Sequence, residues 1–377
     1  MKLIHTSDWH FGMPLGTGSY REDQRFFLQQ LYDVIRREQA EAVLISGDVY
    51  DSSVVSAEAI SLYNEAMTVL CRDLGVTVVM IAGNHDSAAR LSACRELLRS
   101  SGLHITGRLE QSLEPVLLDG GKVAVYSLPF FGREEVTALF PEQKQEIRSQ
   151  ETATMVVCDR IRRSMDPNRF NIVLSHSLVV DAELSESDRS ARVGFATAVS
   201  KEVFHDFDYV ALGHIHKPQI IAPHIRYCGS PLKYSFGKEE NQEKGVVLLD
   251  TETGQQRFVP LAPLHDRLTV EGNYEEIVAR TDLENCYLRL YVLDRYAGLE
   301  LVSDLRERFP YLLETYGKSL TETDTLTALS VEELQQLDEK TIMEKFMAEN
   351  FGCEATPFQK ALFVDVLAWS REEGELG

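Results

Sequence analysis

Five short motifs along the chain combine residue types that bind transition metals. In each motif a polar residue follows closely on a run of apolar residues. The motifs, in chain order, are Asp8-Trp9-His10, Gly47-Asp48, Gly83-Asn84-His85-Asp86, Ser175-His176 and Gly213-His214-Ile215-His216. Carboxylate, amide and imidazole groups form a mixed oxygen and nitrogen donor set, which suits manganese, iron or zinc better than calcium or magnesium alone. The motifs therefore predict a transition-metal site.

The motifs offer more donors than a single ion needs. The seven candidate ligands are Asp8, His10, Asp48, Asn84, His176, His214 and His216. In Asp8-x-His10 and His214-x-His216 the two side chains stand at positions i and i+2 of an extended segment, so both can reach one ion. Seven donors match two ions with a shared carboxylate, for which Asp48 is the natural bridge. Such ions lie roughly 3.5–4 Å apart, clamp a phosphoryl group and activate a water molecule.

His85 is the polar residue of its motif that this ligand set leaves unused. It directly follows the proposed ligand Asn84 and is followed by Asp86. A histidine oriented by a carboxylate can stabilise a pentavalent transition state or donate a proton to a leaving oxygen. We therefore predict a catalytic role for His85, with Asp86 as its orienting group.

Each motif taken alone has a simpler structural explanation. A glycine–aspartate pair after a strand is most often a turn, and a lone Asp-x-His is most often a surface feature. The metal site is favoured because all five motifs occur together, in order, each after a predicted strand. The remaining histidines lie outside the motifs and receive no role: His5, His104, His205, His224 and His265.

The elements expected to position the motifs are alternating strands and helices. Apolar runs predict strands at Lys2–Thr6, Ala42–Ser46, Thr77–Ala82, Lys122–Ser127, Asn171–Ser175, Tyr209–Leu212, Ile225–Tyr227 and Gly245–Asp250. Helical spacing predicts helices at Asp23–Gln39, Ala57–Leu74, Ala88–Arg99 and Glu151–Ser164. Continuous apolar strands suit sheets covered on both faces, so the fold class is a layered α/β sandwich, with much of the later sheet antiparallel or mixed. Ligands in such folds collect at strand ends, where five motifs could converge on one cleft.

The chain is too long, at 377 residues, for one compact core. We expect a main domain over residues 1–262 and a small α/β capping domain over residues 263–327. The latter would contain strands at Tyr287–Leu293 and Tyr311–Thr315 around a helix at Leu299–Phe309. Residues 328–377 turn acidic and helical, with an apolar stripe over Phe358–Trp369, and would form a C-terminal partner-binding segment.

Composition is that of an ordinary globular protein, with 44% apolar and 26% charged residues. No apolar run is long enough to span a membrane, and the N-terminus lacks the apolar core of a secretory signal. The six cysteines are scattered, which favours reduced thiols and a cytoplasmic location. The net charge of −21 disfavours a general polyanion binder, although bound metal ions would add positive charge at the site itself.

In this order, the motifs resemble those of the calcineurin-like metallophosphoesterase superfamily over about residues 1–250. Three longer stretches also resemble the SbcD exonuclease subunits, the bacterial group of Mre-eleven-type nucleases. They are Thr6-Ser7-Asp8-Trp9-His10-Phe11-Gly12, Ser46-Gly47-Asp48-Val49-Tyr50-Asp51 and Tyr227-Cys228-Gly229-Ser230-Pro231-Leu232.

The resemblance implies a two-metal nuclease that acts on DNA in repair and recombination, with two divalent ions, Mn²⁺ in the family. One ion would be held by Asp8, His10, Asp48 and His216, and the other by Asp48, Asn84, His176 and His214. His85 would be catalytic and Asp86 would orient it. The family also implies 3′-to-5′ exonuclease activity on duplexes and endonuclease activity on single strands or hairpins. A coiled-coil ATPase of the SbcC type, bound through the C-terminal helices, would join a nuclease homodimer in a heterotetramer.

One departure from the family concerns the loop after the bridging aspartate. Archaeal and eukaryotic relatives carry a histidine there, where this chain has Val49-Tyr50-Asp51. Any role of that histidine cannot be transferred to this chain.

Two other functions remain open from the residues. A small-substrate phosphodiesterase or phosphatase needs only the catalytic core, and the acidic net charge mildly favours it. An assembly subunit that has lost activity is disfavoured because every ligand position is filled.

Overall fold

The computed structural model describes residues 1–16, 18–188 and 198–318, together with residues 356, 359, 360 and 363. Residues 1–318 form one compact unit. The predicted C-terminal segment, residues 328–377, and its apolar stripe lie almost wholly outside the described residues. Among the described residues, no helix combines the length and apolar character that crossing a membrane requires.

The first sheet contains the N-terminal strand of the chain. Its order is β14 (Gln256–Pro260), β13 (Gly245–Asp250), β1 (Lys2–Thr6), β4 (Ala42–Ile45), β5 (Thr77–Ile81) and β6 (Leu103–Thr106). Strands β1, β4, β5 and β6 run parallel, whereas β13 and β14 are antiparallel to their neighbours. The parallel strands are short apolar runs, as expected for strands buried on both faces.

The second sheet is also mixed. Its order is β11 (Gln219–Ala222), β12 (Ile225–Tyr227), β10 (Tyr209–Gly213), β9 (Phe170–His176), β8 (Val123–Leu128) and β7 (Val116–Leu118). The four central strands are parallel, and the antiparallel pairs involve only the edge strands β7 and β11. The prediction of a mixed later sheet is therefore confirmed, with its antiparallel pairs at the margins.

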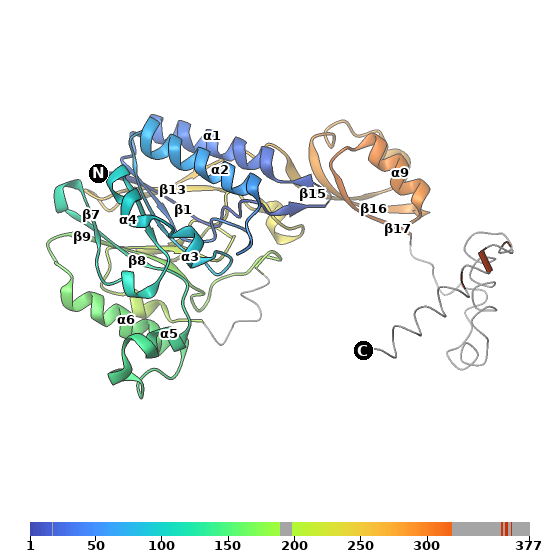
Figure 1. The fold of residues 1–377 in the computed structure, drawn as a ribbon. Coiled ribbons are helices and arrows are strands. Elements are labelled where there is room, and N and C mark those ends of the chain that lie inside the picture. The colour runs from blue at the N-terminus through green and yellow to red at the C-terminus, as the bar shows by residue number, and fades with distance from the viewer. Residues whose placement is uncertain (17, 189–197, 319–355, 357–358, 361–362, 364–377) are drawn as a thin grey trace, which may run out of the picture. The chain divides into compact units, whose positions relative to one another are not determined.

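The two sheets pack face to face with helices outside them (Figure 1). Between the sheets, Leu44 and Val79 of the first meet Ile172 and Leu174 of the second, all fully buried. The outer face of the first sheet packs against α1 (Arg21–Glu38) and α2 (Ala57–Thr68). The outer face of the second packs against α5 (Arg133–Leu139) and α6 (Gln150–Ser164). The layered α/β sandwich with mixed sheets is confirmed.

The helices begin and end for local reasons. Ser149 caps α6 by accepting a hydrogen bond from the Thr152 amide, and α2 continues into a π-helical turn at Val69–Asp73. The predicted single helix over Ala88–Arg99 is wrong. It is divided into α3 (Ala88–Leu91) and α4 (Arg95–Leu98), because Cys94 adopts φ of +57° and interrupts the helical backbone.

Several short elements complete residues 1–262. Residues Pro14–Leu15 (β2) and Gly18–Ser19 (β3) form a small hairpin. Among residues 1–16, 18–188 and 198–262, the 3-10 helices are η2 (Arg99–Ser101), η3 (Leu109–Gln111), η4 (Asp119–Gly121), η5 (Pro141–Gln143), η7 (Lys201–Phe204) and η8 (Lys238–Asn241).

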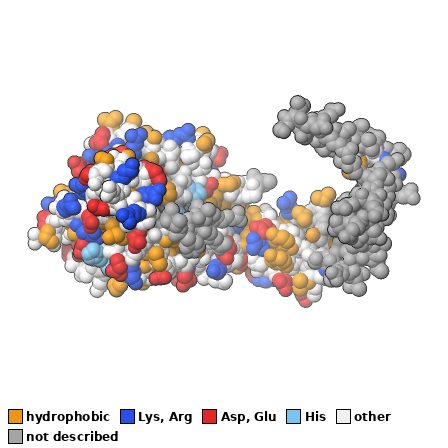
Figure 2. Space-filling view, turned by 90° about the horizontal axis from the view of Figure 1, so that it is seen from below, with side chains coloured by type: hydrophobic (Ala, Val, Ile, Leu, Met, Phe, Trp, Pro, Cys, Tyr) orange, Lys and Arg blue, Asp and Glu red, His pale blue; other side chains and the backbone are white. Residues whose placement is uncertain are grey.

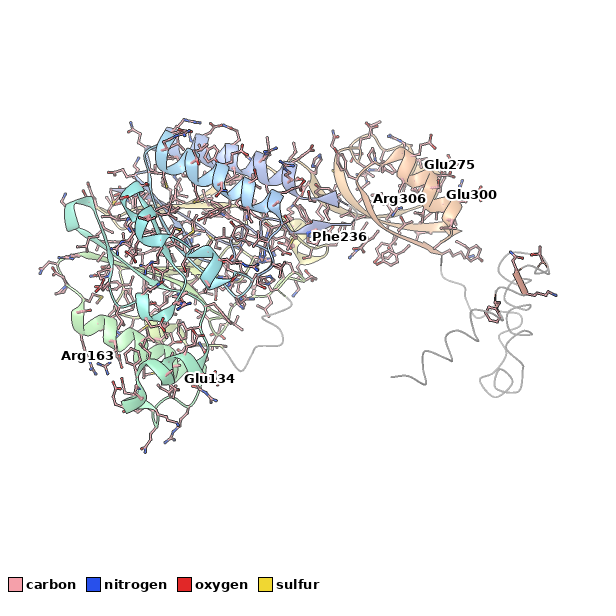
Figure 3. The ribbon with its side chains drawn as sticks, viewed as in Figure 1. Glu134, Arg163, Phe236, Glu275, Glu300 and Arg306 are labelled. Atoms are coloured by element: carbon pink, nitrogen blue, oxygen red, sulfur yellow. The ribbon has the colours of Figure 1, made fainter. Side chains whose placement is uncertain are left out.

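A third sheet follows residue 262. Its parallel strands are β15 (Asp266–Gly272), β16 (Cys286–Tyr296) and β17 (Leu312–Lys318), with α8 (Tyr274–Val278) and α9 (Leu299–Arg308) in the connections. The guanidinium groups of Arg267 and Arg289 each lie 4.5 Å from the ring centre of Phe236, which stands beside this sheet (Figure 3). Because residues 1–318 form one compact unit, a domain boundary at residue 262 stays a prediction.

Candidate metal centre

The candidate ligands stand at the ends of five strands drawn from both sheets. Three of the motifs follow β1, β4 and β5 of the first sheet, and the other two stand at the ends of β9 and β10 of the second. Hydrogen bonds join the first two loops, from the Asp8 amide to the Gly47 carbonyl and from the His10 amide to the Asp48 carbonyl, both 3.0 Å. The parallel strands of each sheet thus deliver their polar ends to one place.

The glycines before the ligands allow this close approach. A Cβ atom on Gly83 would lie 2.1 Å from Oδ1 of Asp48, and one on Gly213 would lie 1.9 Å from the Ser46 carbonyl oxygen. At Gly47 it would lie 2.3 Å from Nδ1 of His176, and there φ is also +93°. Any other residue at these positions would push ligand side chains or their loops apart.

Four candidate ligands have a strained backbone. Asp8, His10, Asp48 and His214 all have positive φ angles, of 55°, 45°, 48° and 98°. Such conformations cost about 1–3 kcal/mol each in non-glycine residues and gather at functional sites. The strain indicates that the fold holds these side chains in place for a purpose other than stability.

One group of donors consists of Asp8, His10 and His216, whose ligand atoms all lie within 4.8 Å of one another. All three residues are buried. The Nε2 atoms of His10 and His216 are 3.1 Å apart, so both rings aim the same atom at a common point. The buried Nδ1 atom of His10 is the ring nitrogen away from His216 and lies 3.3 Å from the Asp51 carboxylate.

The second group consists of Asp48, His176 and His214, whose ligand atoms also lie within 4.8 Å of one another. The amide oxygen of Asn84 joins them, at 3.0 Å from Nε2 of His176 and 2.9 Å from Nδ1 of His214. Oδ2 of Asp48 lies 3.3 Å from Nε2 of His176 and 3.9 Å from Nε2 of His10. Asp48 therefore faces both groups, as a bridging carboxylate must.

The hydrogen-bond directions around His176 fit a bound cation. Its Nδ1 atom lies 2.8 Å from the Ser46 carbonyl oxygen, which can only accept, so Nδ1 carries the ring proton. The Nε2 lone pair then faces oxygens of Asp48 and Asn84, which are acceptors too. Nε2 of His176 and the oxygens of Asp48 and Asn84 thus converge without a hydrogen between them. A cation at that point would accept a lone pair from each.

The pKa values of the histidines at the site are also consistent with a bound cation. Burial opposes protonation of His176, but the adjacent Asp48 carboxylate outweighs it and raises the pKa of His176 to about 9, so a proton can take the cation's place. Burial lowers the pKa of His214 to about 3 and holds that of His216 well below its usual range. These two rings stay neutral near pH 7, which is the form that binds metal.

The predicted partnership between His85 and Asp86 is not the arrangement seen. Nδ1 of His85 lies 2.7 Å from the main-chain oxygen of Asp51, which therefore orients the ring. The Asp86 carboxylate instead accepts hydrogen bonds from the amides of Gly83, Val49 and Tyr50 at 2.9–3.1 Å. Asp86 therefore joins the loop after β4 to the loop after β5, because its carboxylate accepts amides from both loops.

Asp86→Ala is accordingly expected to act on stability first. It leaves three amides without their acceptor, and we expect the free energy of unfolding in urea to fall by about 3 kcal/mol. Asp86→Asn keeps one carbonyl oxygen and should lose less. An Asp86→Ala protein with unchanged stability but little activity would instead restore the predicted role beside His85.

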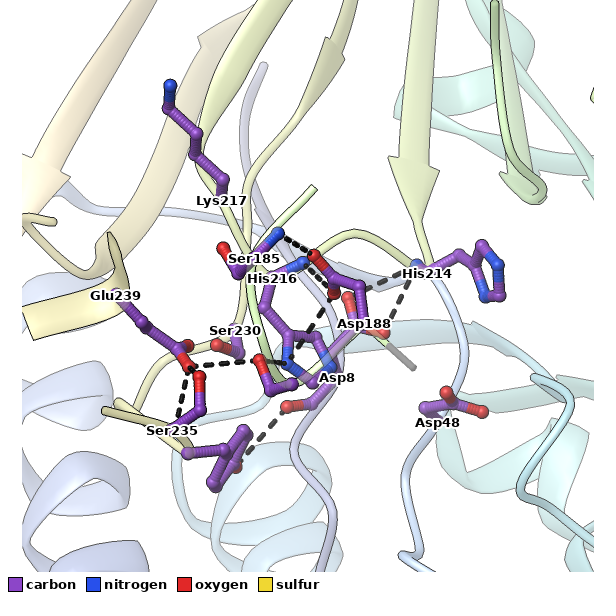
Figure 4. A network of polar contacts seen from close by, with 12 residues as sticks. Asp8, Asp48, Ser185, Asp188, His214, His216, Lys217, Ser230, Ser235 and Glu239 are labelled. Carbon is purple, nitrogen blue, oxygen red and sulfur yellow. Dashed lines mark hydrogen bonds and ion pairs between the residues drawn. The ribbon is translucent and has the colours of Figure 1, made fainter. Parts of the chain in front are cut away.

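Sequence reasoning missed several residues that surround the ligands. Ser187, Asp188, Glu239 and Lys244 contact His216, directly or through one another. Figure 4 shows Asp188 and Glu239 in the polar network around His216. The Tyr234 hydroxyl donates to the Trp9 carbonyl at 2.8 Å. These residues stand in polar or loop segments without a recognisable spacing, so no local signal could have found them.

Comparison with known proteins gives a consistent picture. Residues 1–218 match the family described as calcineurin-like phosphoesterase. A Staphylococcus epidermidis protein, named as a subunit of the nuclease SbcCD, is 33% identical over 353 residues, which cover 92% of each chain. A Staphylococcus saprophyticus protein of the same name is 31% identical over 381 residues, covering 99% of this chain and 100% of that one. A solved dimetal phosphatase from Danio rerio is 11% identical with a TM-score of 0.41, over 66% of this chain and 91% of that one.

Proposed function

The chain belongs to the SbcD family of calcineurin-like phosphoesterases, and from that premise we propose that it cleaves DNA with two divalent metal ions. It is a hydrolase acting on phosphodiester bonds. The observation that carries the proposal is the position of Asp48 between two groups of buried or partly buried donors, each drawn from both sheets. One group would hold one ion through Asp8, His10 and His216, and the other would hold the second through Asn84, His176 and His214.

The protein's own residues would prepare the site for a phosphodiester. Two divalent ions held there would supply charge neutralisation and water activation. His85 lies outside both groups, and the Asp51 carbonyl fixes its proton on Nδ1, which leaves Nε2 to face the substrate. When the ring carries a second proton, the hydrogen on Nε2 would stabilise charge on the phosphoryl oxygens or would pass to the leaving oxygen.

DNA is the proposed substrate because both relatives carry the name of a nuclease. The net charge of −21 favours a small substrate over DNA, because it repels a polyanion. However, Lys and Arg side chains are interspersed among the acidic ones on the face in Figure 2. Positive ions at the site would further favour a polyanion locally. The proposal includes Mn²⁺ as the metal, 3′-to-5′ exonuclease activity on duplexes and endonuclease activity on single strands or hairpins.

A partner is also part of the proposal, because the relatives are named as one subunit of a larger nuclease. We propose a coiled-coil ATPase of the SbcC type, bound by the C-terminal segment, and a homodimer of this chain within a heterotetramer. A gene for a long coiled-coil ATPase beside the gene for this protein would support that assembly.

The function is tested on purified protein with Mn²⁺ and three DNA substrates: a blunt duplex and a hairpin, each labelled at the 5′ end, and an internally labelled single-stranded circle. We expect shortened products from a blunt duplex, internal cuts in a hairpin and in a single-stranded circle, and no products with a chelator. A duplex labelled at the 3′ end should lose its label as a mononucleotide, because the exonuclease would start there.

A chromogenic phosphodiester serves as the matched substrate in the same preparation. Cleavage of that compound, with every DNA substrate left intact, would support the small-substrate phosphodiesterase in place of the nuclease. Inactivity toward both, with metal bound, would favour an assembly subunit.

A further inference from the structure

A buried ion pair lies next to the metal centre and takes no part in the proposed ligand sets. The side chains of Glu239 and Lys244 are 0% and 4% exposed, and Nζ of Lys244 lies 2.6 Å from Oε1 of Glu239. Burying two charges costs several kcal/mol per ion before their attraction is counted. A pair retained at that cost, beside a proposed ligand, suggests a role at the site.

Both members of the ion pair are connected to His216 by hydrogen bonds, Lys244 directly and Glu239 through Ser187. Nζ of Lys244 donates to the His216 carbonyl oxygen at 2.8 Å. The Ser187 hydroxyl lies between Glu239 and the His216 ring, at 2.9 Å from Oε2 of Glu239 and 2.7 Å from Nδ1 of His216. Figure 4 shows Glu239 and His216 within this network.

The direction of each hydrogen bond follows from the carboxylate. Oε2 of Glu239 also receives the amide and the hydroxyl of Ser235, at 2.8 and 2.7 Å, while Oε1 receives Lys244. An ionised carboxylate with these three donors around it acts only as an acceptor, so the Ser187 hydroxyl donates to it. The Ser187 oxygen then has only lone pairs for the His216 ring, and Nδ1 of His216 must carry the hydrogen.

We propose that Ser187 and Glu239 are positioning residues that set the tautomer and orientation of His216, keeping its Nε2 lone pair free for a metal ion. The inference rests on the metal centre of the proposed function. Nε2 is the atom that faces His10 and shares its donor group with Asp8. Histidine ligands are commonly held through their second nitrogen, here by a carboxylate acting through a hydroxyl.

Asp188 has a different part in holding His216. Its Oδ1 atom accepts the His216 amide at 3.0 Å but lies 3.7 Å from Nδ1 of the ring, beyond hydrogen-bond range. Asp188 therefore fixes the main chain, and Ser187 is the partner of the ring.

The test uses three variants of the full chain: Ser187→Ala, Ser187→Thr and Ser235→Ala. Ser235→Ala is the matched control, because it removes another hydroxyl from the same Glu239 oxygen without any contact to His216. Manganese binding is measured by calorimetry, with the metal content checked after dialysis. We expect Ser187→Ala to bind one of the two ions about 10–100-fold more weakly and the other unchanged. Ser187→Thr and Ser235→Ala should bind both ions like the unsubstituted protein.

Three outcomes would overturn the inference. They are unchanged affinity in Ser187→Ala, an equal loss in Ser235→Ala, and a failure of Ser187→Thr to restore binding. Metal uptake by the unsubstituted protein separates these outcomes from failure of the proposed function. If the unsubstituted protein binds two ions but cuts no DNA, only the proposed substrate is contradicted. If it binds no manganese, both the metal centre and this inference are contradicted.

Discussion

Asp48→Asn is expected to reduce phosphodiester cleavage on the order of 10³-fold or more, because it removes a carboxylate that faces both donor groups. The substitution is nearly isosteric. Its amide oxygen can still accept the hydrogen bond that the His85 amide makes to Oδ1 at 2.9 Å. Because asparagine has nearly the size of aspartate, it also keeps the close approach to Gly83, where an added Cβ would lie 2.1 Å from Oδ1 of Asp48.

The charge, rather than the shape, is therefore what this variant removes. Burial alone would raise the pKa of Asp48, but the neighbouring His176 outweighs it and holds the pKa well below its usual range, so the native side chain is ionised. Without that charge, we expect weaker binding of both ions in calorimetry, together with loss of cleavage of the chromogenic phosphodiester and of DNA.

Asp33→Asn is the control for Asp48→Asn, because Asp33 is an exposed aspartate on α1. It should keep full metal content and full activity. An Asp48→Asn protein that binds two ions normally and cleaves at the native rate would refute the bridging role. Loss of a single ion would assign Asp48 to one group only.

His85→Ala is expected to lower kcat by about 10²–10⁴-fold while the metal content stays unchanged. The ring belongs to neither proposed ion site, and alanine keeps the main-chain amide that donates to Asp48. The effect should fall on kcat, with KM for the chromogenic substrate little changed, because a group that holds or transfers a proton in the transition state contributes little to ground-state binding.

The matched control for His85→Ala is His205→Ala, which removes a ring that is 57% exposed and outside the five motifs. Its kcat should equal that of the unsubstituted protein. If His85→Ala instead loses an ion, His85 is a ligand. Ligand atoms of His85, His10 and Asp51 all lie within 4.8 Å of one another and could together hold that ion. An unchanged kcat would remove His85 from the chemistry altogether.

The strands that the sequence failed to predict have a common position. Apart from the two-residue strands β2 and β3, they are the edge strands β6, β7, β11, β14 and β15. An edge strand has a neighbour on one side only and is less covered, so it does not need a continuous apolar run. In β15, buried and exposed positions are mixed over Asp266–Gly272, and its polar start resembled a domain boundary.

The proposed donor set, in contrast, was predicted from local sequence alone. Each motif is a local unit of an apolar strand, a turn and a polar residue, and the bounds of β1 (Lys2–Thr6) and β13 (Gly245–Asp250) were predicted to the residue. Such units depend on neighbouring residues alone, which is why residue types and spacing were enough to predict metal-binding chemistry.

The partners of each donor could not be predicted in the same way. Asp51 rather than Asp86 orients His85, and Ser187 with Glu239 holds His216, although these two lie 29 and 23 residues from it in the sequence. Hydrogen bonds across such separations are set when the two sheets and their loops pack together. Local residue order thus specifies the chemistry of the donors, whereas the packing of two sheets against each other specifies which side chain faces which.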